Sequence, residues 1–157
     1  MTLTEQKSTA MEEIMEQLTV TCRKVKELSV IETNDPALGT LVIDKTNIPS
    51  EQQAGTARRL ICAGAMTCYA GALSLTLDSR GIAYHEIRLS ADVEAGENEK
   101  GQFRIQKMTI NAVVEIDKAD AEKFENVEKV MRGGCPITSS LHEGFAMEYA
   151  LKPHFSS

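Results

Sequence analysis

The chain has 157 residues, of which 42% are hydrophobic, and a formal net charge of −6 at pH 7. This length suits a single domain (residues 1–157) with a substantial core. The acidic balance argues against general nucleic-acid binding, because little would neutralise phosphates in bulk. The sequence contains no Trp, so we expect a core of aliphatic residues, Met and Ala.

The N-terminal third predicts a short helix followed by β-structure. Apolar residues recur at helical spacing within residues 5–18, at Met11, Ile14, Met15 and Leu18. We expect a cytoplasmic protein, because no basic segment followed by an apolar run is visible here. Residues 19–32 are rich in Val, Thr and Ile and predict a strand, and residues 41–43 predict a second, short one. Between them, Asn34-Asp35-Pro36 with Gly39 predicts a turn.

A long apolar helix is predicted over residues 57–79, with Gly81 suited to its C-terminal end. Residues 60–77 carry no charge and reach the lower limit for a membrane span. Their many Ala, Gly, Ser and Thr residues favour a central helix buried by sheets instead, and we expect no membrane insertion. Small residues would let another backbone approach this helix closely, at Gly64, Cys68, Gly71 and Ala72.

Two stretches of period-two alternation, residues 83–93 and 103–116, predict an antiparallel hairpin. The parity changes at Gln106-Lys107, which indicates a β-bulge. His85 falls on the apolar side of its strand and is expected to be a buried histidine.

Two helices are predicted after the hairpin. The first covers residues 119–131 and should bury Phe124, Val127, Val130 and Met131. Gly133-Gly134 ends it, and Cys135-Pro136 begins a last helix, with Pro at the first helical position. That helix is expected to end before Pro153 and to carry Leu141, Phe145 and Tyr149.

The four cysteines are expected to be free thiols, because structural disulfides are rare in a reducing cytosol. None lies in a Cys-x-x-Cys pair or at zinc-finger spacing from a histidine, so we expect no metal. Cys22 and Cys62 are expected to pack in the core. A helix N-terminus favours the thiolate of Cys135, whereas an apolar helix would raise the pKa of Cys68. On these grounds Cys135 is the activated thiol, unless both cysteines are merely structural.

Two cysteine motifs resemble those of the OsmC/Ohr family, the osmotically inducible and organic hydroperoxide resistance proteins. Residues 60–69, LICAGAMTCY, resemble the Ala- and Gly-rich helix that ends in the family's first cysteine and an aromatic residue. Residues 134–138, GCPIT, resemble its second-cysteine motif, and residues 34–39, NDPALG, resemble a turn of one branch. The resemblance covers residues 20–152, and the order and spacing of the motifs make it fairly specific.

The resemblance implies an α/β fold (α+β, OsmC-like), in which antiparallel sheets wrap central long helices in an intertwined homodimer. It implies active sites at the subunit interface. It also implies that Cys68 attacks an organic hydroperoxide and becomes a sulfenic acid, and that Cys135 then condenses with it to a disulfide. An external dithiol such as dihydrolipoamide would restore the pair, and no bound cofactor is implied. This assignment reverses the roles that the residues alone suggest, and we follow the family.

The chain departs from the family pattern beside the first cysteine. Family members carry a Glu ten residues before it, which holds an activating Arg from an early strand. Here that position is Arg58. Glu51 resembles the missing Glu displaced by two helical turns, or Arg58 itself supplies the charge across a dimer. Arg23 is a candidate for the early-strand Arg. For each of these residues the alternative is an ordinary surface charge.

Two leading functions therefore remain open, beside a purely structural role as an interaction protein. The first is thiol-dependent reduction of organic hydroperoxides through Cys68 and Cys135, in response to oxidative stress. The alternative is a catalytically altered family member that binds an apolar ligand or senses redox state. His142 lies on the same helical face as Cys135 and either tunes that thiol or is a surface residue.

Overall fold

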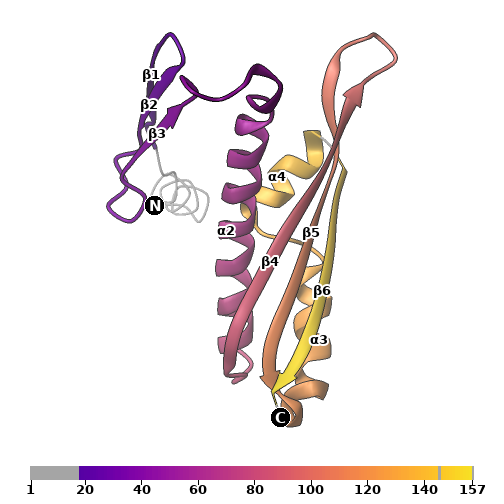
Figure 1. Cartoon of the computed structure of the whole chain (residues 1–157). Helices are drawn as coiled ribbons and strands as arrows, with labels where there is room; N and C mark the ends of the chain where they lie inside the picture. The colour runs from indigo at the N-terminus through magenta and orange to yellow at the C-terminus, as the bar shows by residue number, and fades with distance from the viewer. Residues whose placement is uncertain (1–17, 145, 157) are drawn as a thin grey trace, which may run out of the picture. The chain divides into compact units, whose positions relative to one another are not determined.

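The computed structural model describes residues 18–144 and 146–156 (Figure 1). The predicted helix over residues 5–18 lies, except for Leu18, outside this part of the chain. The described residues form two compact units, which divide between Ala54 and Gly55. That residues 1–157 fold as a single domain stays a prediction.

The N-terminal unit contains an antiparallel sheet in the order β1-β2-β3. Its strands are β1 (Thr21–Val25), β2 (Leu28–Glu32) and β3 (Thr40–Asp44). The single strand predicted over residues 19–32 is thus two strands, joined at Lys26, whose φ of 51° makes the tight turn. The expectation that Cys22 packs in the core is wrong, because all of β1 is exposed in this chain.

The predicted turn at residues 34–39 is confirmed. Asn34 and Gly39 have φ angles of 57° and 67°. The Asp35 carboxylate accepts hydrogen bonds from the backbone N–H groups of Ala37 and Leu38, at 2.7 and 3.0 Å. These are the bonds by which an Asp side chain closes a turn on its own backbone. A short 3-10 helix, η1 (Ser50–Gln52), follows later in the unit.

The second unit begins with the long helix α2 (Thr56–Asp78), which confirms the prediction to within one residue at each end. One side of α2 faces the core, with Cys62, Ala65, Tyr69, Leu73 and Leu77 buried at helical spacing. By length and composition the segment Ser50–Asp78 could cross a membrane, but only 28% of its most apolar window is buried in this chain. Apolar residues on the other side of α2 are exposed in this chain, among them Ile61 and Leu75.

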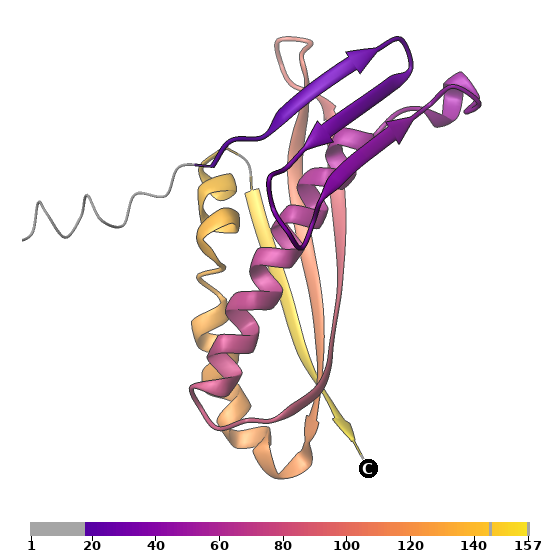
Figure 2. The ribbon, with the colours of Figure 1, turned by 90° about the vertical axis from the view of Figure 1, so that its left-hand side faces the viewer.

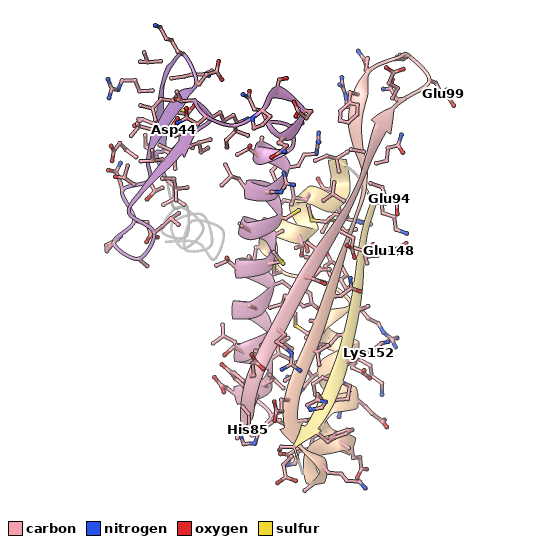
Figure 3. The ribbon with its side chains drawn as sticks, viewed as in Figure 1. Asp44, His85, Glu94, Glu99, Glu148 and Lys152 are labelled. Carbon is pink, nitrogen blue, oxygen red and sulfur yellow. The ribbon has the colours of Figure 1, made fainter. Side chains whose placement is uncertain are left out.

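Three long strands make the sheet of the second unit, in the order β4-β5-β6. The hairpin of β4 (Tyr84–Glu97) and β5 (Phe103–Asp117) is confirmed, and so is the bulge, because Glu94 pairs with Lys107 but Ala95 pairs with Ile105. A second irregularity falls at His85, between the pairs of Tyr84 and Glu86. The expectation of a buried His85 is wrong, because this bulge leaves it exposed at the end of β4 (Figure 3).

A short 3-10 helix, η2 (Lys118–Asp120), leads into α3 (Ala121–Met131). Phe124, Val127 and Met131 are buried as predicted, but Val130 is 50% exposed, so that expectation is wrong. The helix α4 (Pro136–Gly144) then ends earlier than predicted.

The last element is a strand, β6 (Ala146–Ser156), where the sequence predicted helix. It runs parallel to β5. The spacing of Leu141, Phe145 and Tyr149 by four fits a helix, but Met147, Tyr149 and Leu151 alternate as a half-buried strand does. Gly144 separates the two patterns, and Phe145 lies outside the described residues.

The core lies between one face of this sheet and the three helices. Alternate residues of β5 are fully buried, namely Met108, Ile110, Ala112, Val114 and Ile116. Figure 2 shows α3 and α4 on the same side of the sheet, with α2 beside them. α2 contacts α3, α4 and β4 within this unit.

Candidate functional site

Cys135 is held by the local structure that begins α4. The Gly133-Gly134 turn precedes it, and Gly134 has a φ of +72°, which favours glycine. The Cys135 carbonyl accepts the first helical hydrogen bond, from Ser139 N–H at 2.8 Å. The Cys135 N–H donates to Thr138 Oγ1, also at 2.8 Å. The Thr138 side chain thus bonds back to Cys135, the residue that caps the helix, and this bond fixes the backbone of Cys135.

The sulfur of Cys135 is buried but well supplied with hydrogen-bond donors. The side chain is 3% exposed, and Thr138 Oγ1 lies 3.3 Å from Sγ. Burial acts to raise the pKa of this thiol, but hydrogen bonds from the Cys68 thiol, the Thr138 hydroxyl and N–H, and the Ile137 N–H outweigh it. The pKa of Cys135 therefore lies below its ordinary value, as its place at a helix N-terminus predicts.

Cys68 lies beside Cys135, on the middle of α2. Its thiol is half-buried and hydrogen-bonds to the sulfur of Cys135. Burial is the largest cause that raises the pKa of Cys68, and donation to Cys135 raises it further, while the Ile137 N–H acts in the opposite direction. No Arg or Lys of the described residues is among these causes. The two cysteines are thus together, with the thiolate favoured at Cys135, although Cys135 is the more buried.

Two tyrosines, which the sequence analysis did not single out as site residues, border the cysteines. Tyr69 follows Cys68 on α2 and is 1% exposed. Its ring stacks on that of Tyr149 from β6, with centroids 5.3 Å apart and an interplanar angle of 9°. The aromatic residue after Cys68 was a visible signal for Tyr69, whereas Tyr149 had been placed on a helix.

The structure places Arg58 away from Cys68. Arg58 lies in the first turn of α2, ten residues before Cys68, or about 15 Å along the helix axis. Its guanidinium lies over the ring of Phe103, 5.3 Å from the centroid. It therefore packs against the start of β5, and within this chain it does not reach the thiol.

The other charged candidates belong to the N-terminal unit. Glu51 is exposed in η1, where Ser50 Oγ lies 3.4 Å from its carboxylate. Arg23 is exposed on β1 and pairs with Val30. Their relation to Cys68 stays a prediction.

Two further candidates are packing and surface residues. Cys62 is 9% exposed and belongs to the core, as predicted. His142 is exposed, and its Nδ1 accepts a hydrogen bond from Met147 N–H at 3.2 Å, which ties the end of α4 to β6. His142 also lines a cavity of about 520 Å³ with Arg132, Ser139 and Tyr149. Among the described residues no three His, Cys, Asp or Glu side chains are grouped to hold a metal ion.

Comparison with known proteins places this arrangement in a family. Residues 50–150 match the family model of OsmC-like proteins. Peroxiredoxin OsmC of Escherichia coli (strain K12) is 31% identical over 107 residues, which cover 68% of this chain and 74% of the relative.

Solved structures share the fold at lower sequence identity. An OsmC-like protein from Mycoplasma pneumoniae aligns with a TM-score of 0.69 at 12% identity, covering 92% of this chain and 100% of that chain. The organic hydroperoxide resistance protein OhrB of Bacillus subtilis aligns with a TM-score of 0.58 at 23% identity, covering 88% and 98%. With the α/β architecture and the sequence matches together, the chain belongs to the OsmC-like family.

Proposed function

We propose that this protein is a thiol-dependent peroxidase that reduces organic hydroperoxides through Cys68 and Cys135. The observation that carries the proposal is that the two thiols lie close enough, at the N-terminus of α4, for each to shift the pKa of the other. Two thiols that neighbour each other in this way can form a disulfide with little movement of the backbone. The family relative named a peroxiredoxin and the structural neighbour named for organic hydroperoxide resistance support the same chemistry.

Cys68 is the thiol that attacks in this proposal, and Cys135 is the one that resolves. Cys68 is the more exposed of the two, so a hydroperoxide reaches it first. Its sulfur attacks the O–O bond: an S–O bond forms, the O–O bond breaks, and the released alkoxide takes up a proton to become an alcohol. Cys135 sulfur then attacks Cys68 sulfur, an S–S bond forms, and hydroxide leaves and is protonated to water. An external dithiol such as dihydrolipoamide returns two electrons and two protons.

A homodimer completes the site in this proposal. Ile61, Gly64, Cys68, Gly71 and Leu75 fall within about 80° of each other around α2, at about 100° per residue. Leu75 is 71% exposed and Ile61 39% exposed in the single chain. A second copy packed on this stripe would cover it and would enclose Cys68. An activating Arg would then come from the partner or, as the sequence suggests, from Arg23 of the N-terminal unit, because no Arg of residues 55–157 is among the causes that shift the pKa of Cys68.

The test is intact-protein mass spectrometry of the reduced protein after one equivalent of cumene hydroperoxide, followed by peptide mapping. We expect the mass to fall by two protons and the peptides of Cys68 and Cys135 to be linked. Unchanged mass with both thiols free would overturn the proposal.

The order of attack is tested with single-cysteine variants. Cys135→Ser should accumulate a sulfenic acid at Cys68 that a dimedone probe traps, whereas Cys68→Ser should not react. Cys62→Ser is the matched control, because this thiol is on the same helix but faces the core, and it should react as the unmodified protein does. Trapping at Cys135 instead would assign the attacking role to the thiol with the lower pKa.

The raised pKa of Cys68 favours a second candidate function, an interface pocket that binds an apolar ligand without peroxidase activity. A Cys68→Ser, Cys135→Ser double variant separates the two functions. Unchanged binding of a fatty-acid probe by that variant, together with no turnover by the unmodified protein, would support the second.

A further inference from the structure

The hydroxyl group of Tyr69 is buried without a hydrogen-bond partner in the part of the chain that is described. Oη has essentially no exposed surface, and the whole residue is 1% exposed. Native proteins rarely leave a buried hydroxyl unpaired, because losing its bonds to water is costly. The position of this orphan donor, next to Cys68 in the chain, points to a partner that appears in another state of the redox pair.

The surroundings of Tyr69 indicate that this partner is Cys135. The stacked ring of Tyr149 lies against the turn before Cys135: a Cβ built on Gly134 would lie 2.5 Å from Tyr149 Oη and 2.5 Å from Thr138 Oγ1. Burial and the nearby charges of Tyr149 and Cys135 raise the pKa of Tyr69 to about 12. The phenol therefore stays protonated beside Cys135 and remains a donor.

Cys135 loses one of its donors during turnover. In the reduced protein Cys68 raises its own pKa and lowers that of Cys135, as a thiol that donates to the Cys135 sulfur does. Once Cys68 is a sulfenic acid or part of a mixed disulfide, its sulfur carries no proton to donate. Cys135 needs its negative charge stabilised at these two stages, first as the nucleophile and then as the leaving group.

We propose that Tyr69 is a positioning residue whose hydroxyl donates a hydrogen bond to the Cys135 sulfur whenever the Cys68 sulfur is oxidised. The role in turnover rests on the proposed peroxidase function. When an external thiolate attacks Cys68 in the disulfide, a new S–S bond forms to Cys68. The Cys68–Cys135 bond then breaks, and its electron pair goes to Cys135. Tyr69 keeps its proton throughout and acts only as a hydrogen-bond donor.

The experiment measures Cys135 ionisation in a Cys68→Ala background, which removes the thiol donor without any peroxide. Protein labelled with [3-¹³C]cysteine is titrated by NMR, and the Cys135 signal is assigned with Cys135→Ser. Adding Tyr69→Phe should lower the ionisation constant of Cys135 about tenfold, because a hydrogen bond to a charged acceptor is lost. The same Tyr69→Phe change should have a smaller effect where Cys68 is present.

Tyr149→Phe in the Cys68→Ala background is the matched control, and it should leave the ionisation constant within about twofold. An unchanged constant in the Cys68→Ala, Tyr69→Phe protein, or an equal effect of Tyr149→Phe, would overturn the proposal. If Tyr69→Phe does not fold, 3-fluorotyrosine at position 69 tests the same point. A more acidic phenol of similar size donates more strongly and should shift the Cys135 constant in the opposite direction. Since no peroxide is used, loss of peroxidase activity would not affect this result.

Discussion

The Thr138 hydroxyl contacts both the backbone and the sulfur of Cys135. It accepts from Cys135 N–H at 2.8 Å, and it lies 3.2 Å from the Cys135 carbonyl and 3.3 Å from Sγ. Its single proton can go to either acceptor, and a thiolate is the stronger one. Thr138 is fully buried, so no water replaces these bonds if the hydroxyl is removed.

Thr138→Val should therefore destabilise the protein and weaken the Cys135 thiolate. The change keeps the volume but leaves the Cys135 N–H without its partner, at a cost of about 1–3 kcal/mol in the free energy of unfolding. The pKa of Cys135 should rise, because a hydrogen bond that lowers it is lost. Urea unfolding and a thiol titration measure the two effects. Thr138→Ser keeps the hydroxyl and should retain the low pKa, and a Ser variant that behaves like Val would contradict this explanation.

Gly134→Ala should disrupt the turn that positions Cys135. A Cβ would lie 2.5 Å from both Thr138 Oγ1 and Tyr149 Oη, and the φ of +72° is unfavourable for alanine in any case. We expect a loss of more than about 2 kcal/mol in the free energy of unfolding. Gly133→Ala is the neighbouring control: its φ is not positive, and the nearest atom to a Cβ there is Val130 O at 3.5 Å. Equal effects of the two changes would show that the close approach at Gly134 is not what matters.

Much of this fold follows from local sequence patterns. The long helix, the β4–β5 hairpin and the bulge at Gln106 were predictable because each has a strong period or a break in one. The wrong predictions arise where the apolar residues fit both a helical and a strand spacing, or where a bulge interrupts the strand spacing. Tyr149 fits a helix with Leu141 and a strand with Met147, and only pairing with β5, far away in the chain, decides between them. His85 was misplaced because a bulge changes which face a strand residue occupies.

The site was only partly predictable for a related reason. The motifs placed Cys135 at a helix N-terminus, where its low pKa follows from local structure. The contact between Cys68 and Cys135 could be expected only from the family, because it depends on how α2 packs against α4. The stacking of Tyr69 on Tyr149 depends on the same packing and on β6, so no local pattern indicated it.

Leu75→Arg should prevent the proposed dimer. Leu75 is 71% exposed in the single chain and lies on the same stripe of α2 as Cys68. A charge buried at an interface without a partner costs several kcal/mol. Sedimentation should therefore show a dimer for the unmodified protein and a monomer for this variant. Val130→Arg, at an exposed apolar residue of α3, is the control and should remain dimeric. A monomeric unmodified protein would exclude the dimer.

Arg58→Ala tests what replaced the family's glutamate. The cation–π contact with Phe103 is worth about 0.5–1 kcal/mol at an exposed site, and a double-mutant cycle with Phe103→Leu measures this coupling. Because Arg58 lies about 15 Å from Cys68 along α2, the variant should keep the rate of reaction with hydroperoxide within about twofold. A much larger loss of rate would mean that Arg58 of a second subunit acts on Cys68.

Stability should fall at high pH because of Tyr69. Burial raises the pKa of this phenol to about 12 in the folded protein, against an ordinary value of 10.0. Between these values the unfolded chain releases the proton and the folded chain keeps it, so the free energy of unfolding decreases as the pH rises. The loss should approach about 2–3 kcal/mol by pH 12, at 1.36 kcal/mol for each pKa unit.

Urea unfolding of the unmodified protein and of Tyr69→Phe at several values between pH 9 and pH 12 isolates this contribution. Other groups titrate in the same range, but they are common to both proteins and cancel in the difference. As the pH rises, Tyr69→Phe should become more stable relative to the unmodified protein, because phenylalanine has no proton to lose. A difference that does not change with pH would mean that the phenol ionises as easily in the folded protein as in the unfolded chain. Tyr69 would then not be buried against the ring of Tyr149, as its inferred role as a donor requires.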